Sequence, residues 1–377
     1  MRLSPFRIFI VSFTFLSACS KADVQTESVG KLKLEAEQQS ESWGAPEHTH
    51  ADFVSVMASS ECPKEEDGVK YIDPLPKLIE LARERNVVMI NEAHYKPIHR
   101  AFIGELAKGL KTVGYDFYGA ETFAVSQFSK NNRNSELSSR GYPILSDGVY
   151  TEEPIFGQLI ETLIDNEYQL FSYESTTPLP PEARSNITHR DSEQARNIIS
   201  EIGNSRDKKI LIHAGYDHVR ENQHNRSEKW MAQYFKEQSG IDPLTISQTD
   251  CYSASAYDSG ILGYAMPVNK EGKPLSFAAY DVLLIPPKEV QYKERPIWLK
   301  EVSGRNFVDV PQELKLDDQY TRIIAYDLGK VKDAVVEDTI YRAPHSDKSL
   351  ALRPGTYRLE VTDKNKTLLV QGQLSVQ

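Results

Sequence analysis

Residues 91–99, NEAHYKPIH, bring a glutamate, two histidines and a tyrosine together directly after the apolar run VVMI. Glu92 and His94 are separated by one residue, so a carboxylate and an imidazole can meet in this loop. A carboxylate beside a histidine fixes the tautomer and tunes the pKa of the imidazole, and such a pair can activate water or an alcohol as a general base. The stretch therefore predicts acid–base chemistry, unless it is polar only because loops are polar.

Other ionisable residues follow other apolar runs in the same way. Glu121 ends the strand-like run YDFYGAE, and Tyr173 and Glu174 lie near the end of YQLFSYES. His213 ends the apolar part of KKILIHAG, and His218 follows within four residues of that run's last glycine. If these runs are parallel strands, the residues after them lie at one edge of the sheet, where ligands bind in such folds. Polar residues also gather at strand ends without any function, but we expect these glutamates and histidines together to mark a crevice.

Strand-like and helical patterns alternate along the segments that would position these residues. The strand-like runs occupy residues 87–90, 115–121, 168–175, 208–215 and 242–249. Apolar residues recur at helical spacing in residues 74–86, 98–114, 153–167, 190–204 and 227–240. This alternation predicts an α/β fold with a mostly parallel sheet and helices on both of its faces. We expect this domain to occupy residues 61–300.

Arg190 begins one of the helical segments and adds a permanent positive charge to the expected crevice. It can hold a carboxylate or phosphate, or stabilise a developing oxyanion, while a histidine donates a proton to the leaving group. The catalytic candidates are therefore Glu92, His94, Glu121, Arg190, His213 and His218. The sequence contains no G-x-S-x-G, H-E-x-x-H, P-loop or Rossmann glycine motif, which excludes those standard sites. Imidazoles and carboxylates suit Zn, Mn or Fe, but their spacing does not identify a metal.

The same crevice would also suit haem. Tyr95, His99 and Tyr216 are the candidate cofactor ligands, because tyrosine and histidine side chains both ligate ferric haem iron. Arg190 could then pair with a propionate. The sequence contains no C-x-x-C-H motif, which excludes covalently attached c-type haem.

The N-terminus predicts export and a lipid anchor. Residues 1–18 combine two arginines with an apolar stretch that is too short to span a bilayer, as in a secretory signal peptide. The motif LSAC at residues 16–19 has the pattern of a bacterial lipobox, in which Cys19 is lipidated, and Ser20 favours sorting to the outer membrane. Residues 19–60 are rich in Glu, Gln, Ser and Lys and predict a flexible tether. We expect an envelope protein anchored by lipid and facing the periplasm; the alternative is an ordinary signal peptide with an incidental cysteine.

The net charge of the chain limits which partners it is expected to bind, and its cysteines bear on whether it contains a disulfide. The net charge of −10 becomes −12 when the signal peptide and its two arginines are removed, so binding to nucleic acid is not expected. With Cys19 lipidated, Cys62 and Cys251 remain, and an oxidising compartment favours a disulfide between them. The alternative is two buried free thiols.

The C-terminal part of the chain changes to an all-β pattern. Residues 301–377 contain the runs TRIIAYDL, DTIYRA and PGTYRLEVTDKNKTLLVQGQLSV, and apolar and polar residues alternate in the last of these. The segment predicts a small β-sandwich module. A structural cap is the favoured role for this module, and binding of a partner or a cell-wall component is the alternative.

Several short motifs carry a resemblance to the superfamily that joins ChaN-like haem-binding lipoproteins, erythromycin esterases and Tiki-type proteases. After the first predicted strand, Glu92, His94, Pro97 and His99 match the ChaN-like pattern, and Glu121 matches it after the second strand. Asn91 stands where that pattern usually has a glycine before the glutamate. HRDSEQARNI is similar to a helix of the esterase branch through Arg190, Asp191, Ala195 and Asn197, with Gln194 in place of a methionine. Gly215 and His218 match a ChaN-like element after the last strand. The resemblance covers roughly residues 70–250.

Two functions follow from this resemblance as expectations. The ChaN-like motifs imply a pocket that binds haem, iron or a similar acidic small molecule. The esterase-like helix implies a hydrolase of an ester, a lactone or an amide that uses the Glu, His and Arg candidates. Both functions would use the same residues, so the sequence leaves the choice open.

Overall fold

The computed structural model describes residues 68–124, 135–176, 186–203, 207–222, 229–251, 260–276, 279–288 and 290–377. The predicted signal peptide, Cys19 and the tether lie outside these residues and stay predictions. Cys251 is buried and disulfide-bonded, but its predicted partner Cys62 also lies outside the described residues, so the pairing stays a prediction. Within the described part of the chain, no helix has both the length and the apolar character needed to cross a membrane.

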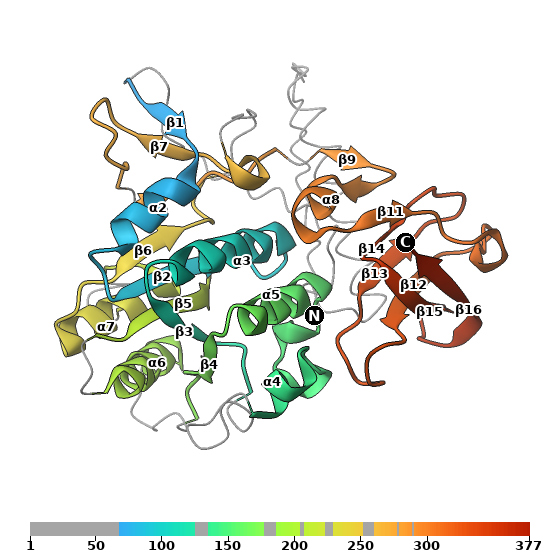
Figure 1. Cartoon of the computed structure of the whole chain (residues 1–377), viewed down its shortest axis with the longest axis horizontal. Coiled ribbons are helices and arrows are strands. Elements are labelled where there is room, and N and C mark those ends of the chain that lie inside the picture. Colours follow the sequence, from blue (N-terminus) through green and yellow to red (C-terminus); the bar gives the residue numbers. More distant parts are fainter. Residues whose placement is uncertain are drawn as a thin grey trace, which may run out of the picture.

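A central sheet of six strands organises the larger part of the molecule (Figure 1). Its strands are β2 (Val87–Glu92), β3 (Tyr115–Ala120), β4 (Gln169–Ser172), β5 (Lys209–Gly215), β6 (Leu244–Ser247) and β8 (Val282–Leu283). They lie in the order β4-β3-β5-β2-β6-β8, and every neighbouring pair is parallel. The predicted parallel sheet is therefore confirmed, and β2 and β5 lie at its centre.

Helices cover both faces of this sheet. They are α2 (Pro74–Ala82), α3 (Pro97–Lys111) and α5 (Pro154–Asp165) on one face, and α6 (Asn186–Ile202) and α7 (Met231–Ser239) on the other. All six residues of β2 are buried, because alternate side chains enter two different cores. Val88 and Ile90 pack in the core with α3, whereas Val87 and Met89 pack in the core with α6.

Short elements complete this part of the chain. They are α4 (Ser135–Arg140), α8 (Trp298–Ser303), and the antiparallel pairs β1 (Lys70–Ile72) with β7 (Met266–Val268) and β9 (Gln291–Tyr292) with β10 (Arg295–Pro296). The domain boundary predicted between residues 300 and 301 falls inside α8, which carries Trp298 and Leu299 into the same core as α3.

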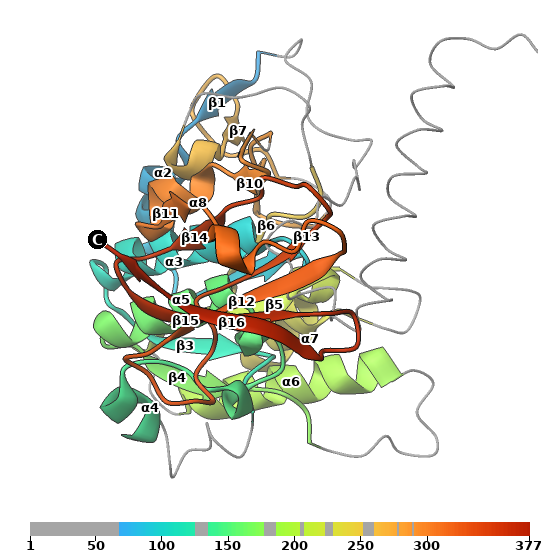
Figure 2. The same ribbon diagram turned by 90° about the vertical axis from the view of Figure 1, so that its right-hand side faces the viewer.

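The C-terminal part consists of antiparallel sheets, as predicted (Figures 1 and 2). Its strands are β11 (Asn306–Val308), β12 (Thr321–Asp327), β13 (Asp338–Arg342), β14 (Leu350–Leu352), β15 (Gly355–Thr362) and β16 (Leu368–Val376). A four-stranded sheet in the order β13-β12-β15-β16 shares one core with the pair β11-β14. That shared core includes Ile323 and Leu359 from the larger sheet and Leu350 and Leu352 from the smaller one.

Hydrogen bonds and partly buried ion pairs join the C-terminal sheets to α5. Arg305 is buried, contacts Gln158 on α5, and donates to the carbonyl oxygens of Glu337 and Ala351 at 2.6 and 2.9 Å. Arg353 binds the carboxylate of Glu337 and also contacts Glu161 of α5 at 2.6 Å. Breaking such pairs would leave buried charges without compensation, so these contacts hold the C-terminal module in a fixed position on α5.

Candidate active site

A buried ion network holds Glu92 at the C-terminal end of β2. The Nε and Nη2 atoms of Arg100, on α3, donate to the two carboxylate oxygens of Glu92 at 2.7 and 2.9 Å. Arg100 also donates to the carbonyl oxygen of His94 at 2.7 Å and to Glu153 at 3.0 Å. Burial alone would raise the pKa of Glu92, but the charge of Arg100 and the contacts with His213 and His94 outweigh it and hold the pKa well below its usual value. Glu92 is therefore an ionised carboxylate in a dry environment.

The N-terminus of α5 supplies the second carboxylate of this network. Glu153 precedes Pro154, the first residue of the helix, and accepts hydrogen bonds from the backbone N–H groups of Ile155 and Phe156. This is the position where a carboxylate stabilises a helix through its unpaired N–H groups and its dipole. Glu153 thus caps α5 and neutralises part of the charge of Arg100 at the same time.

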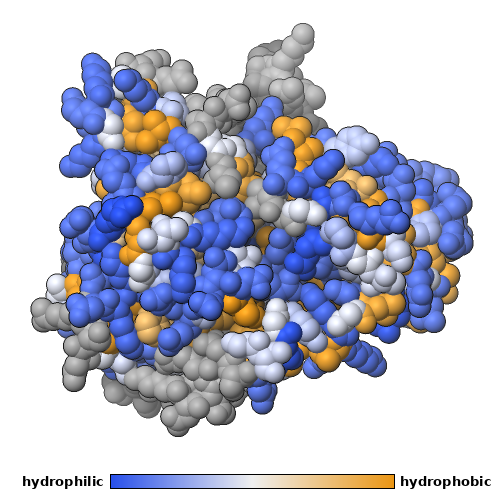
Figure 3. Space-filling view, viewed as in Figure 1, coloured by the Kyte–Doolittle hydropathy of each residue, from blue (hydrophilic) through white to orange (hydrophobic). Residues whose placement is uncertain are grey.

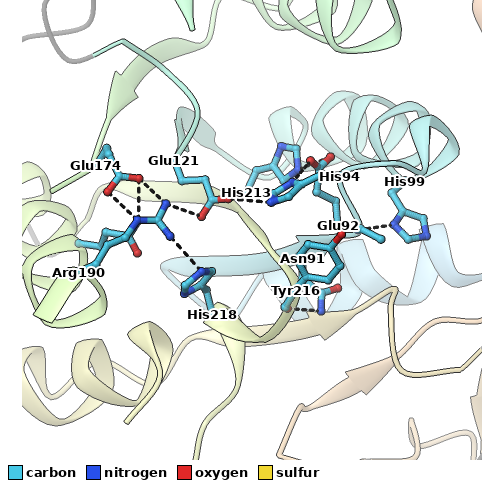
Figure 4. Close-up of polar contacts among 12 residues, drawn as sticks. Asn91, Glu92, His94, His99, Glu121, Glu174, Arg190, His213, Tyr216 and His218 are labelled. Carbon is cyan, nitrogen blue, oxygen red and sulfur yellow. Dashed lines mark hydrogen bonds and ion pairs between the residues drawn. The ribbon is translucent and has the colours of Figure 1, made fainter. Parts of the chain in front are cut away.

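His94 lies between two carboxylates. Its Nδ1 is 2.9 Å from Oε1 of Glu92, and its Nε2 is 3.6 Å from Oε1 of Glu121, which follows β3 (Figure 4). The side chain of His94 is 19% exposed, whereas Glu92 and Glu121 are buried. The edge of the Tyr216 ring packs against the imidazole with ring centroids 4.9 Å apart. The buried carboxylate of Glu92 therefore orients a partly accessible imidazole through Nδ1, as the partner of a general base does.

Gly215 makes room for the contact between His94 and Glu121. A Cβ atom at this position would lie 2.4 Å from Cε1 of His94 and 2.9 Å from Oε1 of Glu121. The φ of Gly215 is −81°, a value open to any residue, so the requirement for glycine is purely steric.

Replacing Gly215 with alanine should therefore destabilise the protein by about 1–3 kcal/mol, the usual cost of overpacking, because His94 and Glu121 must move apart. Urea unfolding measures this change in free energy. Gly104→Ala is the matched control. Its new Cβ would lie 3.6 Å from Cδ1 of Leu159, an ordinary van der Waals contact, and Gly104 lies within α3, where alanine is favourable. Equal stability of the two variants would contradict the close approach at Gly215.

His213 contacts the carboxylate oxygen of Glu92 that His94 does not. Its Nε2 is 3.0 Å from Oε2 of Glu92, and its Nδ1 is 2.7 Å from the hydroxyl oxygen of Tyr118. The buried ring stacks on Phe156 with centroids 5.4 Å apart. Glu92, Glu121 and His213 also line a cavity of about 10 Å³, which is close to the space that one water molecule requires.

Arg190, on α6, lies between three polar side chains at the other end of the site. Its Nε donates to Glu174 at 2.9 Å, and its Nη2 donates to the second oxygen of Glu174 and lies 3.4 Å from Oε2 of Glu121 (Figure 4). Its Nη1 is 3.2 Å from Nε2 of His218. The side chain of Arg190 is 34% exposed, so its guanidinium remains accessible although carboxylates surround it.

His218 is held in turn by Asp191, the residue after Arg190. Its Nδ1 is 2.7 Å from Oδ1 of Asp191, and its ring meets Trp230 edge-on. Burial by itself would lower the pKa of His218, but the close contact with the Asp191 carboxylate and the charges of Glu121 and Asp191 raise it above its usual value. The Asp191–His218 pair thereby fixes one side of the Arg190 guanidinium.

The structure therefore brings all six catalytic candidates into one connected cluster. His94 joins Glu92 to Glu121, and Arg190 joins Glu121 to His218 (Figure 4). Acidic groups dominate this cluster: its carboxylates are Glu92, Glu121, Glu153, Glu174 and Asp191, and its guanidinium groups are Arg100 and Arg190. These five carboxylates outnumber the two guanidinium groups, and a protonated His218 would offset only one of the three extra negative charges, so the cluster favours a neutral or cationic ligand over an acidic one.

The three candidate cofactor ligands have different surroundings. His99 is completely buried, its Nδ1 accepts a hydrogen bond from the N–H of Ala93 at 3.0 Å, and burial holds its pKa well below the usual value. It therefore stabilises the turn between β2 and α3. Tyr95 and Tyr216 lie beside each other with ring centroids 6.4 Å apart, and Tyr216, adjoining His94, is only partly buried. Among the described residues, no group of three or more His, Cys, Asp or Glu side chains is arranged to hold a metal ion.

Sequence reasoning missed several residues that support the site. Arg100 and Glu153 were not among the candidates, although an apolar helix face that contains an arginine signals a buried ion pair. Asn91 was not among the candidates either. Its Nδ2 donates to the carbonyl oxygen of Tyr216 at 2.7 Å, and its Oδ1 accepts from the N–H of Gln248 at 2.7 Å. Asn91 thus ties the exits of β2, β5 and β6 together, and a polar residue within the run VVMINE was its signal.

Comparisons with known proteins show a distant likeness of fold. No family model and no curated protein matches the chain significantly. The type III effector HopBA1 aligns with a TM-score of 0.37 and 12% identity over 60% of this chain and 100% of its own. RRSP, a MARTX toxin effector domain from Vibrio vulnificus, aligns with a TM-score of 0.36 and 13% identity over 47% of this chain and 36% of its own. ChaN of Campylobacter jejuni, which binds haem cofacially, aligns with a TM-score of 0.35 and 10% identity over 60% and 99% of the two chains.

Proposed function

We propose that this cluster is the active site of a hydrolase that cleaves an ester, a lactone or an amide. The observation that carries this proposal is the position of His94, whose two ring nitrogens face Glu92 and Glu121 while its side chain remains partly exposed. A general base must be accessible to the proton it removes and must be oriented by a second group. His94 meets both requirements.

In the proposed reaction, ionised Glu92 orients His94 and stabilises the imidazolium that forms. A water molecule in the crevice transfers a proton to Nε2 of His94 as its oxygen attacks the carbonyl carbon of the substrate. The C–O or C–N bond then breaks, and the imidazolium returns the proton to the leaving group. Arg190 supplies positive charge for the oxyanion of the tetrahedral intermediate, and Glu174 and the Asp191–His218 pair hold its guanidinium in place.

The charge of the site sets the substrate class within this proposal. Arg190 already binds Glu174 through two hydrogen bonds and lies close to Glu121, so pairing with a substrate carboxylate would require those contacts to break. The surrounding carboxylates would also repel an anion. A neutral or positively charged ester, lactone or amide is therefore a better substrate than an acidic one, which revises the expected acidic small molecule.

We expect hydrolysis of neutral or cationic substrates at rates that exceed those of acidic analogues by tenfold or more, roughly the effect of one unfavourable charge contact of 1.4 kcal/mol. A panel of esters, lactones and amides, each with a neutral, a cationic and an anionic acyl group, measures this preference through kcat/KM. A preference for anionic members would contradict the charge argument. If none of the compounds is hydrolysed, the proposal that the protein is a hydrolase is contradicted.

One observation favours haem binding as a second candidate function. The partly buried Tyr216 lies beside His94 and Tyr95, and a tyrosine can serve as the ligand of ferric haem. Titration of the same protein with haemin tests this candidate: a tyrosinate-ligated spectrum that Tyr216→Phe abolishes would support it. An unchanged haemin spectrum would exclude Tyr216 as the ligand.

A further inference from the structure

A second cavity lies in the C-terminal module, apart from the crevice. It has a volume of about 170 Å³ and is formed by the end of β12, the segment that leads to β13, and Arg358 of β15. A dry cavity of similar size, about 150 Å³, is known to admit a benzene molecule in another protein. The space in the C-terminal module is therefore sufficient for a ligand the size of a single ring.

Apolar side chains are exposed at this cavity. Leu328 and Val331, which line it, are 46% and 48% exposed, although both are large hydrophobic residues. On the face of the molecule shown in Figure 3, hydrophobic side chains form small separate patches among hydrophilic ones. Apolar residues around a hollow offer contact to the apolar part of a ligand, because burying them removes their surface from water.

The charged lining of the cavity is mainly basic. Lys330, Lys332 and Arg358 line it together with one carboxylate, that of Asp327, in a chain whose net charge is −10. The carboxylate of Asp327 accepts a hydrogen bond from the N–H of Gly329 at 2.8 Å, so one of its oxygens already has a hydrogen-bond donor within the same turn. Three basic side chains thus meet in the lining, although carboxylates from outside it, Glu161 and Glu360, pair with two of them.

The three cations are not equivalent. Lys330 pairs with Glu161 on α5, so its charge serves the junction between the two parts of the molecule. Arg358 contacts Glu360 through Nε at 3.1 Å and lies over the ring of Tyr326 at 4.6 Å, an arrangement that holds the guanidinium in a fixed plane at the cavity. Lys332 is exposed at the rim. Lys332 is therefore the cation best placed to bind an anion, and Arg358 can join it through guanidinium nitrogens other than Nε, the atom that contacts Glu360.

From these contacts we infer that the cavity is a binding site for a small anion that carries an apolar ring, such as an aromatic carboxylate or phosphate. The ring would pack against Leu328 and Val331, and the acidic group would face Arg358 and Lys332. The site lies beside the junction between the two parts of the molecule, where Lys330 pairs with Glu161 of α5 and the N–H of Val331 donates to the hydroxyl of Tyr142 at 3.1 Å. A ligand held there would contact a segment that is fixed on both parts of the molecule, so binding should raise the thermal stability of the whole protein.

Benzoate and phenyl phosphate are the test ligands, used with the full-length protein in calorimetric titration and thermal unfolding. We expect both anions to bind and to raise Tm in proportion to the logarithm of their concentration. Benzyl alcohol and benzylamine, which have the ring but no negative charge, should not bind, and neither should acetate, which has the charge but no ring. Binding of only one of the two anions would identify the acidic group that the site accepts and would support the inference.

Two variants locate the binding within this cavity. Arg358→Gln and Lys332→Gln should each weaken binding roughly tenfold, the change expected for loss of one charge-assisted hydrogen bond. Lys364→Gln, which removes an exposed cation in the turn between β15 and β16, is the matched control and should bind as the unmodified protein does. Lys332 is exposed, so its substitution leaves folding intact even if that of Arg358 does not. Absence of binding by both anions, equal binding of benzylamine, or unchanged binding by Lys332→Gln would each overturn the inference.

Discussion

Replacing Arg100 with methionine should destabilise the protein by about 3–5 kcal/mol, the range measured when one partner of a buried ion pair is removed. Arg100 is completely buried and donates hydrogen bonds to Glu92, Glu153 and the carbonyl oxygen of His94. Methionine fills a similar elongated space but leaves two buried carboxylates without a positive charge. Urea unfolding at neutral pH measures the loss, which exceeds a third of the stability of many domains.

Two further variants separate charge from packing in this prediction. Arg196→Met removes an arginine that is 58% exposed and contacts Glu193 one turn away on α6, so it should change stability by less than about 0.5 kcal/mol. Adding Glu92→Gln and Glu153→Gln to Arg100→Met should recover part of the loss, because neutral amides need no buried cation. If Arg100→Met is as stable as Arg196→Met, the buried network does not stabilise the fold.

The effect of Arg100→Met should also depend on pH. The pKa of Glu92 is held well below its usual value in the folded protein, so its stabilising contribution is present above its ordinary pKa of about 4.5 and is lost as the pH falls through the lowered value. Without Arg100, burial dominates and favours protonated Glu92. Acidification therefore destabilises the unmodified protein more than the variant, and the difference between them should become smaller at low pH.

The sheet was predictable because its strands are short, apolar and separated by amphipathic helices. The run VVMI predicted a short buried strand, and the structure divides its side chains between two cores. The strand order was not predictable from this pattern. It depends on crossovers that place β5 between β2 and β3, although β4 precedes β5 in the chain. Local periodicity contains no information on which strands become neighbours.

The cluster of site residues was predictable from one geometric rule, since the ends of parallel strands open on the same edge of a sheet. That rule places Glu92, Glu121 and His213 near one another without knowledge of the strand order. It could not find Arg100 or Glu153, because these residues come from helices whose packing brings them beneath the crevice. Long-range packing of this kind leaves only a weak trace in a single sequence.

The acidic character of the crevice was also hidden from sequence reasoning. Arg190 suggested a site for an acidic ligand as long as its own partners were unknown. The structure shows that Glu174 and Glu121 already surround its guanidinium, and that Asp191 lies beside them through His218. A residue type indicates which chemistry is available, but only the neighbouring charges determine which ligand it can accept.

Replacing His94 with alanine should lower kcat/KM for the substrates of the proposed hydrolase by about 10²–10⁴-fold, the usual contribution of a general base. His94 is the accessible group between Glu92 and Glu121, and no other imidazole of the cluster faces both carboxylates (described residues only). The side chain is only 19% exposed and packs against Tyr216, so the substitution should cost roughly 1–3 kcal/mol of stability and still leave the protein folded. Steady-state kinetics and urea unfolding of the same preparation measure the two effects separately.

A remote histidine provides the matched control for this prediction. His345 is exposed in the C-terminal module and has a φ of 58°, so His345→Asn keeps a residue that tolerates the left-handed backbone conformation. It should leave turnover unchanged. The general-base role requires that His94→Ala remain folded while turnover falls, and that the limb of the pH–rate profile assigned to the free base disappear with it. If His94→Ala unfolds the protein, or folds and hydrolyses the substrate at the original rate, the imidazole supports the fold and the base must be sought elsewhere in the cluster.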